Sequence, residues 1–390
     1  MKTGPEKQAH ILRAQSCAPD ARDAVREFHA AVTQPDMALV IFFCASTYDL
    51  EALADEMRQL FAGVQVVGCT TAGEIGPAGY QDHSLTGASF PAGSFTAVSG
   101  CIEQLQRFGI AKGQAIAQEL LQKLENRAPR ANPQNTFAFL MVDGLSTREE
   151  PVTRALQSAL DGIPLVGGSA GDGVKFGSTY VYSEGRFHAD SAVLTLVSTP
   201  LPFKPFKTQH FVATEERLVV TDADAAHRIV KEINGLPAAQ EYARILGIDE
   251  RDLGPLRFAA SPVVVLIDGT NYVRSVQKVN PDESLTFFCA IENGLVFRVA
   301  KGVNLLENLE QTFTRIRAEV GPAQLVLACE CILRKLEISQ SHLKESVGEV
   351  FRRNNTIGFN TYGEQFQGVH VNQTLVGIAI GSAATETGDA

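Results

Sequence analysis

Three copies of one short motif constrain the fold of this chain more than any other feature of its sequence. The copies lie at 67–74, 165–172 and 357–364, and each ends in a glycine followed by an acidic residue. Glycine at a turn permits a positive φ or lets another group approach the backbone closely. Aligned without gaps, the motifs place together Gly73, Gly171 and Gly363. Three copies of a motif indicate a chain that contains duplicated units.

The residues around the motifs repeat in the same order. An apolar run that predicts a strand precedes each motif, at 39–43, 137–142 and 325–329. Apolar residues at a spacing of three to four predict a helix between each run and its motif. A further helix is expected before each run and a second strand after each turn. These outer elements are expected at 21–33, 110–126 and 303–318 for the helices and at 85–90, 192–197 and 374–380 for the strands.

The order of these elements predicts a mixed α/β (α+β) fold. The repeated helix–strand–helix–turn–strand units are expected to form mixed sheets that helices cover. A chain of 390 residues exceeds the size at which one core stops growing, and the proline-rich segment 199–206 marks a connector. We therefore expect an N-terminal domain over 1–215 with two units. A C-terminal domain over 216–390 is expected to open with a helix at 225–246, followed by antiparallel strands and the third unit.

Composition and charge narrow the classes of function. The net charge is −10 and no block of lysine or arginine is longer than a pair, whereas a nucleic-acid-binding protein needs a basic stripe. No apolar run reaches the length of a membrane span, and residues 1–21 do not resemble a secretion signal. The odd number of cysteines, 7, indicates free thiols in a reducing compartment. We expect a cytoplasmic protein that binds neither nucleic acid nor membrane.

Several motifs of known enzymes are missing. The sequence contains no Gly-x-x-x-x-Gly-Lys-Ser/Thr phosphate loop, no Gly-x-Gly-x-x-Gly after a strand and no His-Glu-x-x-His. A Gly-x-Ser-x-Gly nucleophile elbow is not expected either. The pair Cys329 and Cys331 has no second pair with which to complete a zinc site. We therefore expect no catalytic residues, and we predict that the chain is not an enzyme.

The motifs resemble those of the FIST family of sensory proteins. The resemblance is carried by 66–74, 164–172 and 361–374, and it extends over about 25–382 as an N-terminal and a C-terminal FIST domain. It implies a ligand-binding module of signal transduction. Chains of this size in the family resemble nitric-oxide-sensing haemoproteins that regulate a partner histidine kinase. The resemblance thus implies haem b as cofactor, nitric oxide as ligand and a histidine kinase as partner; a homodimer is also expected.

An alternative within the family dispenses with haem. A FIST module can bind an amino acid or another small metabolite, and the hydroxyl and acidic residues beside each turn glycine are candidates for holding it. Such residues can also do no more than satisfy backbone amides at the turn. Both interpretations stay open at the level of the sequence.

The haem hypothesis requires an axial imidazole and an apolar pocket. His370 is the candidate iron ligand because it lies closest to the third turn, and His188 and His210 are the next candidates. Aromatic residues near the turn are expected to form pocket walls, and a neighbouring amide is expected to orient the imidazole. The expected cofactor-binding residues are His370, Tyr362, Phe359, Phe366, Asn372, Gly363 and Glu364.

Overall fold

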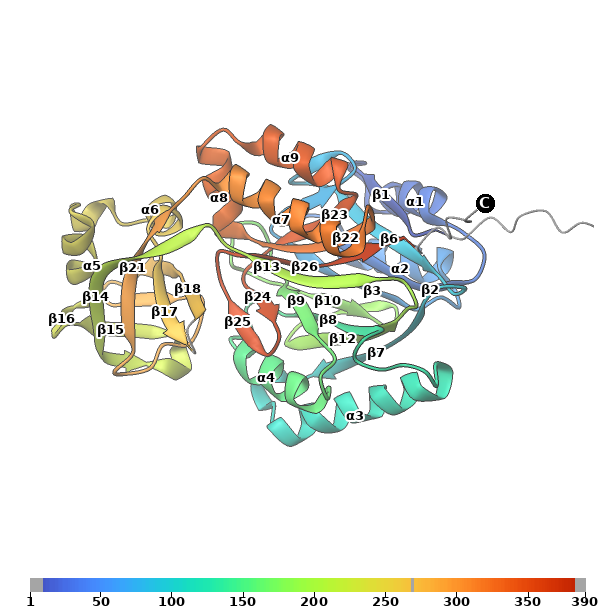
Figure 1. The fold of residues 1–390 in the computed structure, drawn as a ribbon, viewed down its shortest axis with the longest axis horizontal. Coiled ribbons are helices and arrows are strands. Elements are labelled where there is room, and N and C mark those ends of the chain that lie inside the picture. Colours follow the sequence, from blue (N-terminus) through green and yellow to red (C-terminus); the bar gives the residue numbers. More distant parts are fainter. Residues whose placement is uncertain (1–9, 268–269, 383–390) are drawn as a thin grey trace, which may run out of the picture.

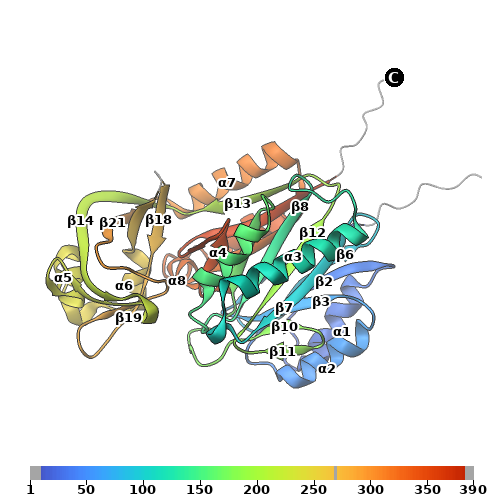
Figure 2. The ribbon, with the colours of Figure 1, turned by 90° about the horizontal axis from the view of Figure 1, so that it is seen from below.

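The computed structural model describes residues 10–267 and 270–382 of the chain. Within these residues, three consecutive units form one body, and a smaller insertion domain, residues 211–302, interrupts the third unit. Figures 1 and 2 both show the insertion domain at one end of the molecule, beside α8 (Ile332–Gln340) and α4 (Glu149–Ala159). No helix in the described ranges combines the length and the apolar character that crossing a bilayer requires.

The three units share one order of elements. The first consists of β1 (Leu12–Ser16), α1 (Ala21–Val32), β2 (Met37–Ala45), α2 (Leu50–Leu60), β3 (Val66–Thr71), β4 (Glu74–Gly76), β5 (Gly79–Gln81) and β6 (Leu85–Pro91). The second consists of β7 (Thr96–Glu103), a 3₁₀ turn (Leu105–Arg107), α3 (Ile110–Arg127), β8 (Thr136–Val142), α4, β9 (Leu165–Ser169), β10 (Val181–Ser183), β11 (Arg186–His188) and β12 (Ser191–Ser198). The third consists of β13 (Phe203–Thr208), α7 (Leu305–Val320), β22 (Ala323–Cys331), α8, α9 (Lys344–Arg353), β23 (Thr356–Thr361), β24 (Glu364–Phe366), β25 (Val369–Val371) and β26 (Leu375–Gly381).

The sheets exchange hairpins in a cycle. Their orders are β1-β6-β2-β3-β10-β11, β7-β12-β8-β9-β24-β25 and β13-β26-β22-β23-β4-β5. Four strands of each sheet come from one unit, and a short hairpin from another unit completes it: the second unit completes the first, the third completes the second and the first completes the third. In each sheet one parallel pair accompanies antiparallel pairs. The predicted mixed α/β class, with helix-covered mixed sheets, is confirmed.

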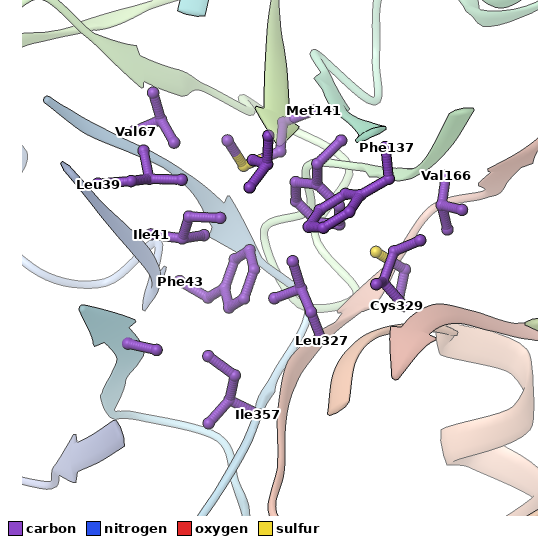
Figure 3. Close-up of a cluster of buried hydrophobic side chains, with 14 of the residues drawn as sticks. Leu39, Ile41, Phe43, Val67, Phe137, Met141, Val166, Leu327, Cys329 and Ile357 are labelled. Atoms are coloured by element: carbon purple, nitrogen blue, oxygen red, sulfur yellow. The ribbon is translucent and has the colours of Figure 1, made fainter. Parts of the chain in front are cut away.

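A single apolar core joins the inner faces of the three sheets. Phe43 stacks on Phe359 with ring centroids 4.5 Å apart and lies 6.4 Å from Phe139, so each sheet contributes one of these rings. Figure 3 shows Leu39, Ile41 and Phe43 pointing into this core. The intervening residues of β2 pack on the helices instead, and strands covered on both faces are continuously apolar, as this run is.

The close approach of the parallel strands depends on glycine. A Cβ atom at Gly68 would lie 2.6 Å from the carbonyl oxygen of Phe42, and the same approach is closer still at Gly167 and Gly358. These three glycines therefore occupy equivalent positions in the three units.

We expect Gly358→Ala to destabilise the protein because the added carbon overlaps the backbone of β22. Overpacking of this kind costs about 1–3 kcal/mol in the free energy of unfolding. Gly93→Ala is the matched control, since a Cβ there meets no atom within 4 Å. Urea unfolding of both variants measures the difference, and equal stabilities would contradict the assigned strand contact.

The strand register corrects the alignment of the second motif. Counting from the equivalent glycines, Asp172 rather than Gly171 matches Gly73 and Gly363. The hairpins agree with this count. In each sheet the residue after the equivalent glycine pairs with the start of a hairpin: Cys69 with Val181, Phe359 with Glu74 and Gly168 with Glu364. The expected equivalence of Gly171 is wrong by one residue. The cause is a longer loop before β10, which an alignment without gaps cannot accommodate.

The insertion domain is a separate antiparallel sheet with two helices. It comprises β14 (Phe211–Asp224), 3₁₀ turns (Ala225–His227 and Glu250–Asp252), β15 (Ile229–Ile233), β16 (Leu236–Pro237), α5 (Ala238–Leu246), α6 (Pro255–Ala260), β17 (Val263–Ile267), β18 (Thr270–Arg274), β19 (Val276–Val279), β20 (Leu285–Phe287) and β21 (Val296–Gly302). The helix expected over 225–246 is therefore wrong in its first half. Asn234 and Gly235 both have positive φ there and turn β15 back into β16, as Asn-Gly pairs do in hairpins.

The predicted domain boundary, between 215 and 216, falls inside β14. The strand before it, β13, pairs with β26 near the C-terminal end of the described chain. The division into an N-terminal domain, 1–215, and a C-terminal domain, 216–390, stays a prediction. The pairing of β13 with β26 joins the two ranges in one sheet.

Candidate functional site

The three turns meet at one end of the body. Backbone hydrogen bonds link them in a cycle: Ala72 N donates to Asn360 O at 2.9 Å, Gly171 N to Thr70 O at 3.0 Å and Tyr362 N to Ser169 O at 3.3 Å. The insertion domain covers this end, where its Phe288 and Ala259 pack with Ala72 and Tyr362. We call this contact between the turns and the insertion domain the junction.

The acidic residues of the first and third turns are satisfied inside their own units. Glu364 accepts hydrogen bonds from the hydroxyl of Thr361 and from Thr374, whose N and Oγ1 lie 3.1 and 2.6 Å away. Glu74 has the same contacts with Thr71 and Ser84. Burial raises the pKa of Glu364 to about 8 and that of Glu74 to about 7. These two carboxyl groups hold the turns together and are not open to a ligand.

Asp172, the acid of the second turn, has different partners. It accepts the hydroxyl of Tyr362 and the backbone N–H groups of Phe176, Gly177 and Ser178. Burial opposes ionisation, but these hydrogen bonds outweigh it and lower the pKa of Asp172. The acid therefore orders the long loop of the second unit.

His370 lies on β25 at the junction and is 3% exposed. Its Nε2 donates to the carbonyl oxygen of Phe288 at 3.2 Å, and its Nδ1 accepts from Gln365 Nε2 at 3.4 Å. The ring also packs on Gly363, where a Cβ would lie 2.7 Å from Nε2. Burial lowers the pKa of His370, which favours the neutral imidazole.

This arrangement does not fit an axial haem ligand. Both ring nitrogens of His370 already have protein partners, and protein atoms surround the ring. The expected pocket walls are separated from one another: Phe359 is in the central core, and Phe366 lies 5.9 Å from the ammonium of Lys207. Tyr362 lies at the junction, but its hydroxyl donates to Gly173 O in the Asp172 loop. Of the expected site, the structure brings together Gly363, His370 and Asn372, with Glu364 at the start of the same hairpin.

The other candidate histidines lie away from the junction turn. His210 Nε2 donates to Glu337 at 2.8 Å, and its Nδ1 accepts from Arg334 at 3.0 Å, so its ring is fully used within the fold. His188 lies on β11, in the sheet of the first unit.

A group of buried amides beside His370 lacks hydrogen-bond partners. Among the described residues, neither Oδ1 nor Nδ2 of Asn372 has one, and Oε1 of Gln365 and of Gln373 also have none. All three side chains are 0% exposed. An unsatisfied buried polar group costs about 1–3 kcal/mol. The group offers both donors and acceptors to a polar molecule that enters the junction.

An ion pair crosses the junction next to this group. Arg228 Nη2, from the insertion domain, lies 2.6 Å from Glu149 Oε2 and 2.5 Å from Glu150 Oε2, at the start of α4. Arg228 also donates to Phe288 O at 3.0 Å, and Ala290 N donates to Glu150 at 2.8 Å. Acidic residues at a helix start need no other explanation than the helix dipole. No local pattern in the sequence therefore identified this pair.

The stretch 167–171 nevertheless reads Gly-x-Ser-x-Gly, so the expected absence of this pattern from the sequence is wrong. Ser169 is buried and accepts from Gln365 Nε2 at 2.9 Å. A nucleophile elbow lies between a strand and a helix, whereas β9 is followed by a loop and β10. The pattern here therefore lacks the structural context of the hydrolase motif.

Models of FIST domains match most of the chain. The FIST N domain model matches residues 38–236, and the FIST C domain model matches residues 238–367. An uncharacterised protein of Methanocaldococcus jannaschii is 23% identical over 349 residues, which are 80% of this chain and 67% of that protein. A solved structure of cyanuric acid hydrolase aligns with 95% of this chain and 99% of its own, at 10% identity and a TM-score of 0.36.

The match to a hydrolase contradicts the prediction that the chain is not an enzyme. That prediction is wrong because it excluded catalysis altogether. Missing motifs do not exclude catalysis, because the same chemistry recurs on unrelated residue patterns. At this level of similarity the hydrolase assigns no activity to the chain.

Proposed function

The chain belongs to the FIST family of small-ligand-binding sensory domains, and from this premise we propose that it senses a polar metabolite at the junction. The observation that carries the proposal is the buried amide group of Asn372, Gln365 and Gln373. Retaining such groups without a protein partner costs stability, so a role in binding accounts for them.

An amino acid or a similar zwitterion is the ligand class that we propose. The amides supply donors and acceptors, while Arg228 and Glu150 supply charges of both signs close to His370. A ligand that takes over contacts of Arg228 or of Phe288 O would shift the insertion domain relative to the body. That movement is our proposed output signal.

Haem, nitric oxide, a histidine kinase as partner and the cytoplasmic location rest on sequence and family resemblance alone. The contacts of His370 argue against haem in this conformation. An absorption spectrum after reconstitution with haem tests the rival ligand. A Soret band that disappears in His370→Ala, with the fold retained, would favour haem over a metabolite.

We expect Asn372→Leu to stabilise the ligand-free protein by about 1–3 kcal/mol, because it removes two unsatisfied buried atoms. The same variant should lose the rise in melting temperature that a panel of free amino acids produces in the wild-type chain. Asn354→Leu is the matched control. It should destabilise the protein, because both amide atoms of Asn354 are hydrogen-bonded.

Two outcomes would contradict the proposal. One is that no amino acid of the panel shifts the melting temperature of the wild-type chain. The other is that Asn372→Leu destabilises the protein as much as Asn354→Leu, which would give Asn372 a purely structural role.

A further inference from the structure

Three side chains of metal-binding type converge where an edge strand of the first sheet, β11, meets an edge strand of the second sheet, β7. Cys101 and Glu103 stand on the same face of β7, and His188 ends β11. One ligand atom of each lies within 4.8 Å of the others. Thiolate, imidazole and carboxylate are the three protein ligand types of Zn²⁺ sites, and ligand atoms this close can share one ion.

The contacts of His188 provide a second, independent observation. The ring is buried, and its Nε2 lies 3.1 Å from the backbone carbonyl oxygen of Ser183, which can only accept a hydrogen. Its Nδ1 lies 3.1 Å from Glu103 Oε1, which in the ionised carboxylate is also an acceptor. A neutral imidazole carries one N–H and satisfies only one of them. One ring nitrogen therefore faces an acceptor without an N–H of its own, and its lone pair is available to a cation.

A cavity lies near the three residues, although none of them lines it. It has a volume of about 520 Å³, and its lining includes Ser99, Ser183 and Glu184. Ser99 precedes Cys101 by two residues on β7, and Ser183 is the acceptor for His188. Neighbours of Cys101 and His188 thus link the cluster to this cavity.

We propose that Cys101, Glu103 and His188 bind a divalent transition-metal ion of the Zn²⁺ type, with a fourth coordination position left to water or to a ligand from the cavity. Three protein ligands and one exchangeable position are the composition of open zinc sites. The hydrogen bond from Nε2 to Ser183 O leaves Nδ1 as the ligating atom and fixes the ring. This site is separate from the junction and does not depend on the proposed metabolite.

Two local features oppose binding, and both are surmountable. Arg186 lies 3.3 Å from Glu103, but both side chains are more than half exposed, and such pairs contribute little stability. Burial, together with Glu103 and Glu184, raises the pKa of the Cys101 thiol to about 12. Metal binding must therefore displace the thiol proton, so affinity should increase with pH.

Titration of the full-length chain with Zn²⁺ alone, followed by calorimetry, tests the site. We expect one ion per chain, and a Co²⁺-loaded sample should show a sulfur-to-cobalt charge-transfer band. Cys101→Ser should remove this band, and His188→Gln should weaken Zn²⁺ binding by at least about 100-fold, the upper end of what loss of a second-shell partner causes. Cys17→Ser and His83→Gln are matched controls because both residues are exposed elsewhere, and they should leave binding unchanged.

A measurement on the wild-type chain avoids any effect of the variants on folding. Zn²⁺ should slow alkylation of Cys101 and leave the rate at Cys17 unchanged. The proposal fails if the wild-type chain binds no stoichiometric Zn²⁺, if Cys101→Ser keeps the cobalt band, or if Zn²⁺ leaves the alkylation of Cys101 unaltered.

Discussion

Replacing Arg228 with methionine should lower the free energy of unfolding by about 3–5 kcal/mol, the usual cost of breaking a buried ion pair from one side. Glu149 is only 1% exposed in this pair and would be left with an uncompensated charge at the junction. Glu150 would keep the N–H of Ala290 but lose its cation. The loss should appear in urea unfolding and as faster proteolysis of the insertion domain.

A matched control separates burial from charge. Arg251 pairs with Asp249 in the same domain, but the two side chains are 89% and 49% exposed, so Arg251→Met should change stability by less than about 1 kcal/mol. Adding Glu149→Leu to Arg228→Met should recover much of the loss, because apolar replacements of buried pairs are often close to neutral. If Arg228→Met proves as mild as Arg251→Met, Arg228 does not fasten the junction.

The strands of the three units could be predicted from sequence because their signals are local. The run at 39–43 is apolar without interruption, as a strand buried on both faces must be, and β2 spans it. The strand with which a short hairpin pairs could not be predicted. Residues 74–81 form a hairpin whose first strand, β4, pairs with β23, at the other end of the chain. A three-residue strand carries no information about such a distant partner.

In the candidate site, too, local features could be predicted and distant partners could not. The third turn was identified from its glycine and its acid, and Gly363, His370 and Asn372 do lie together. The partners that determine the chemistry of the junction come from the insertion domain: Phe288 O for His370, and Arg228 for Glu149. Sequence spacing cannot reveal that a histidine has both nitrogens engaged, which is the observation that bears on haem. The Asn-Gly pair at 234–235 is a local hairpin signal, but the sequence prediction placed a helix over 225–246 instead.

Glu364→Gln should make the protein more stable than wild type in mildly alkaline buffer and leave its stability almost unchanged in acid. Burial raises the pKa of Glu364 from 4.5 to about 8, so the folded protein binds a proton that the unfolded chain releases. Stability from this group is therefore complete below pH 4.5 and is lost as the pH rises towards 8. Each pKa unit corresponds to about 1.4 kcal/mol, so the full loss is on the order of 5 kcal/mol.

Glutamine reproduces the protonated carboxyl group in shape and bonding. Its oxygen can accept from Thr374, and its amide can donate to the hydroxyl of Thr361. Arg334 lowers the pKa of Glu364, and the value of about 8 already includes this attraction. The stability difference between variant and wild type should therefore grow by about 1.4 kcal/mol per pH unit across this window.

Two control variants test the physical cause of this slope. Glu74→Gln changes the equivalent residue of the first unit and should give the same sign over a narrower window, since the pKa of Glu74 rises only to about 7. Glu345→Gln changes a carboxylate that is 86% exposed and should give no comparable slope. Chemical unfolding of all three variants and wild type at several pH values supplies the measurement. A Glu364→Gln variant that loses stability relative to wild type as the pH rises would mean that Glu364 is ionised in the fold and stabilises it as a carboxylate.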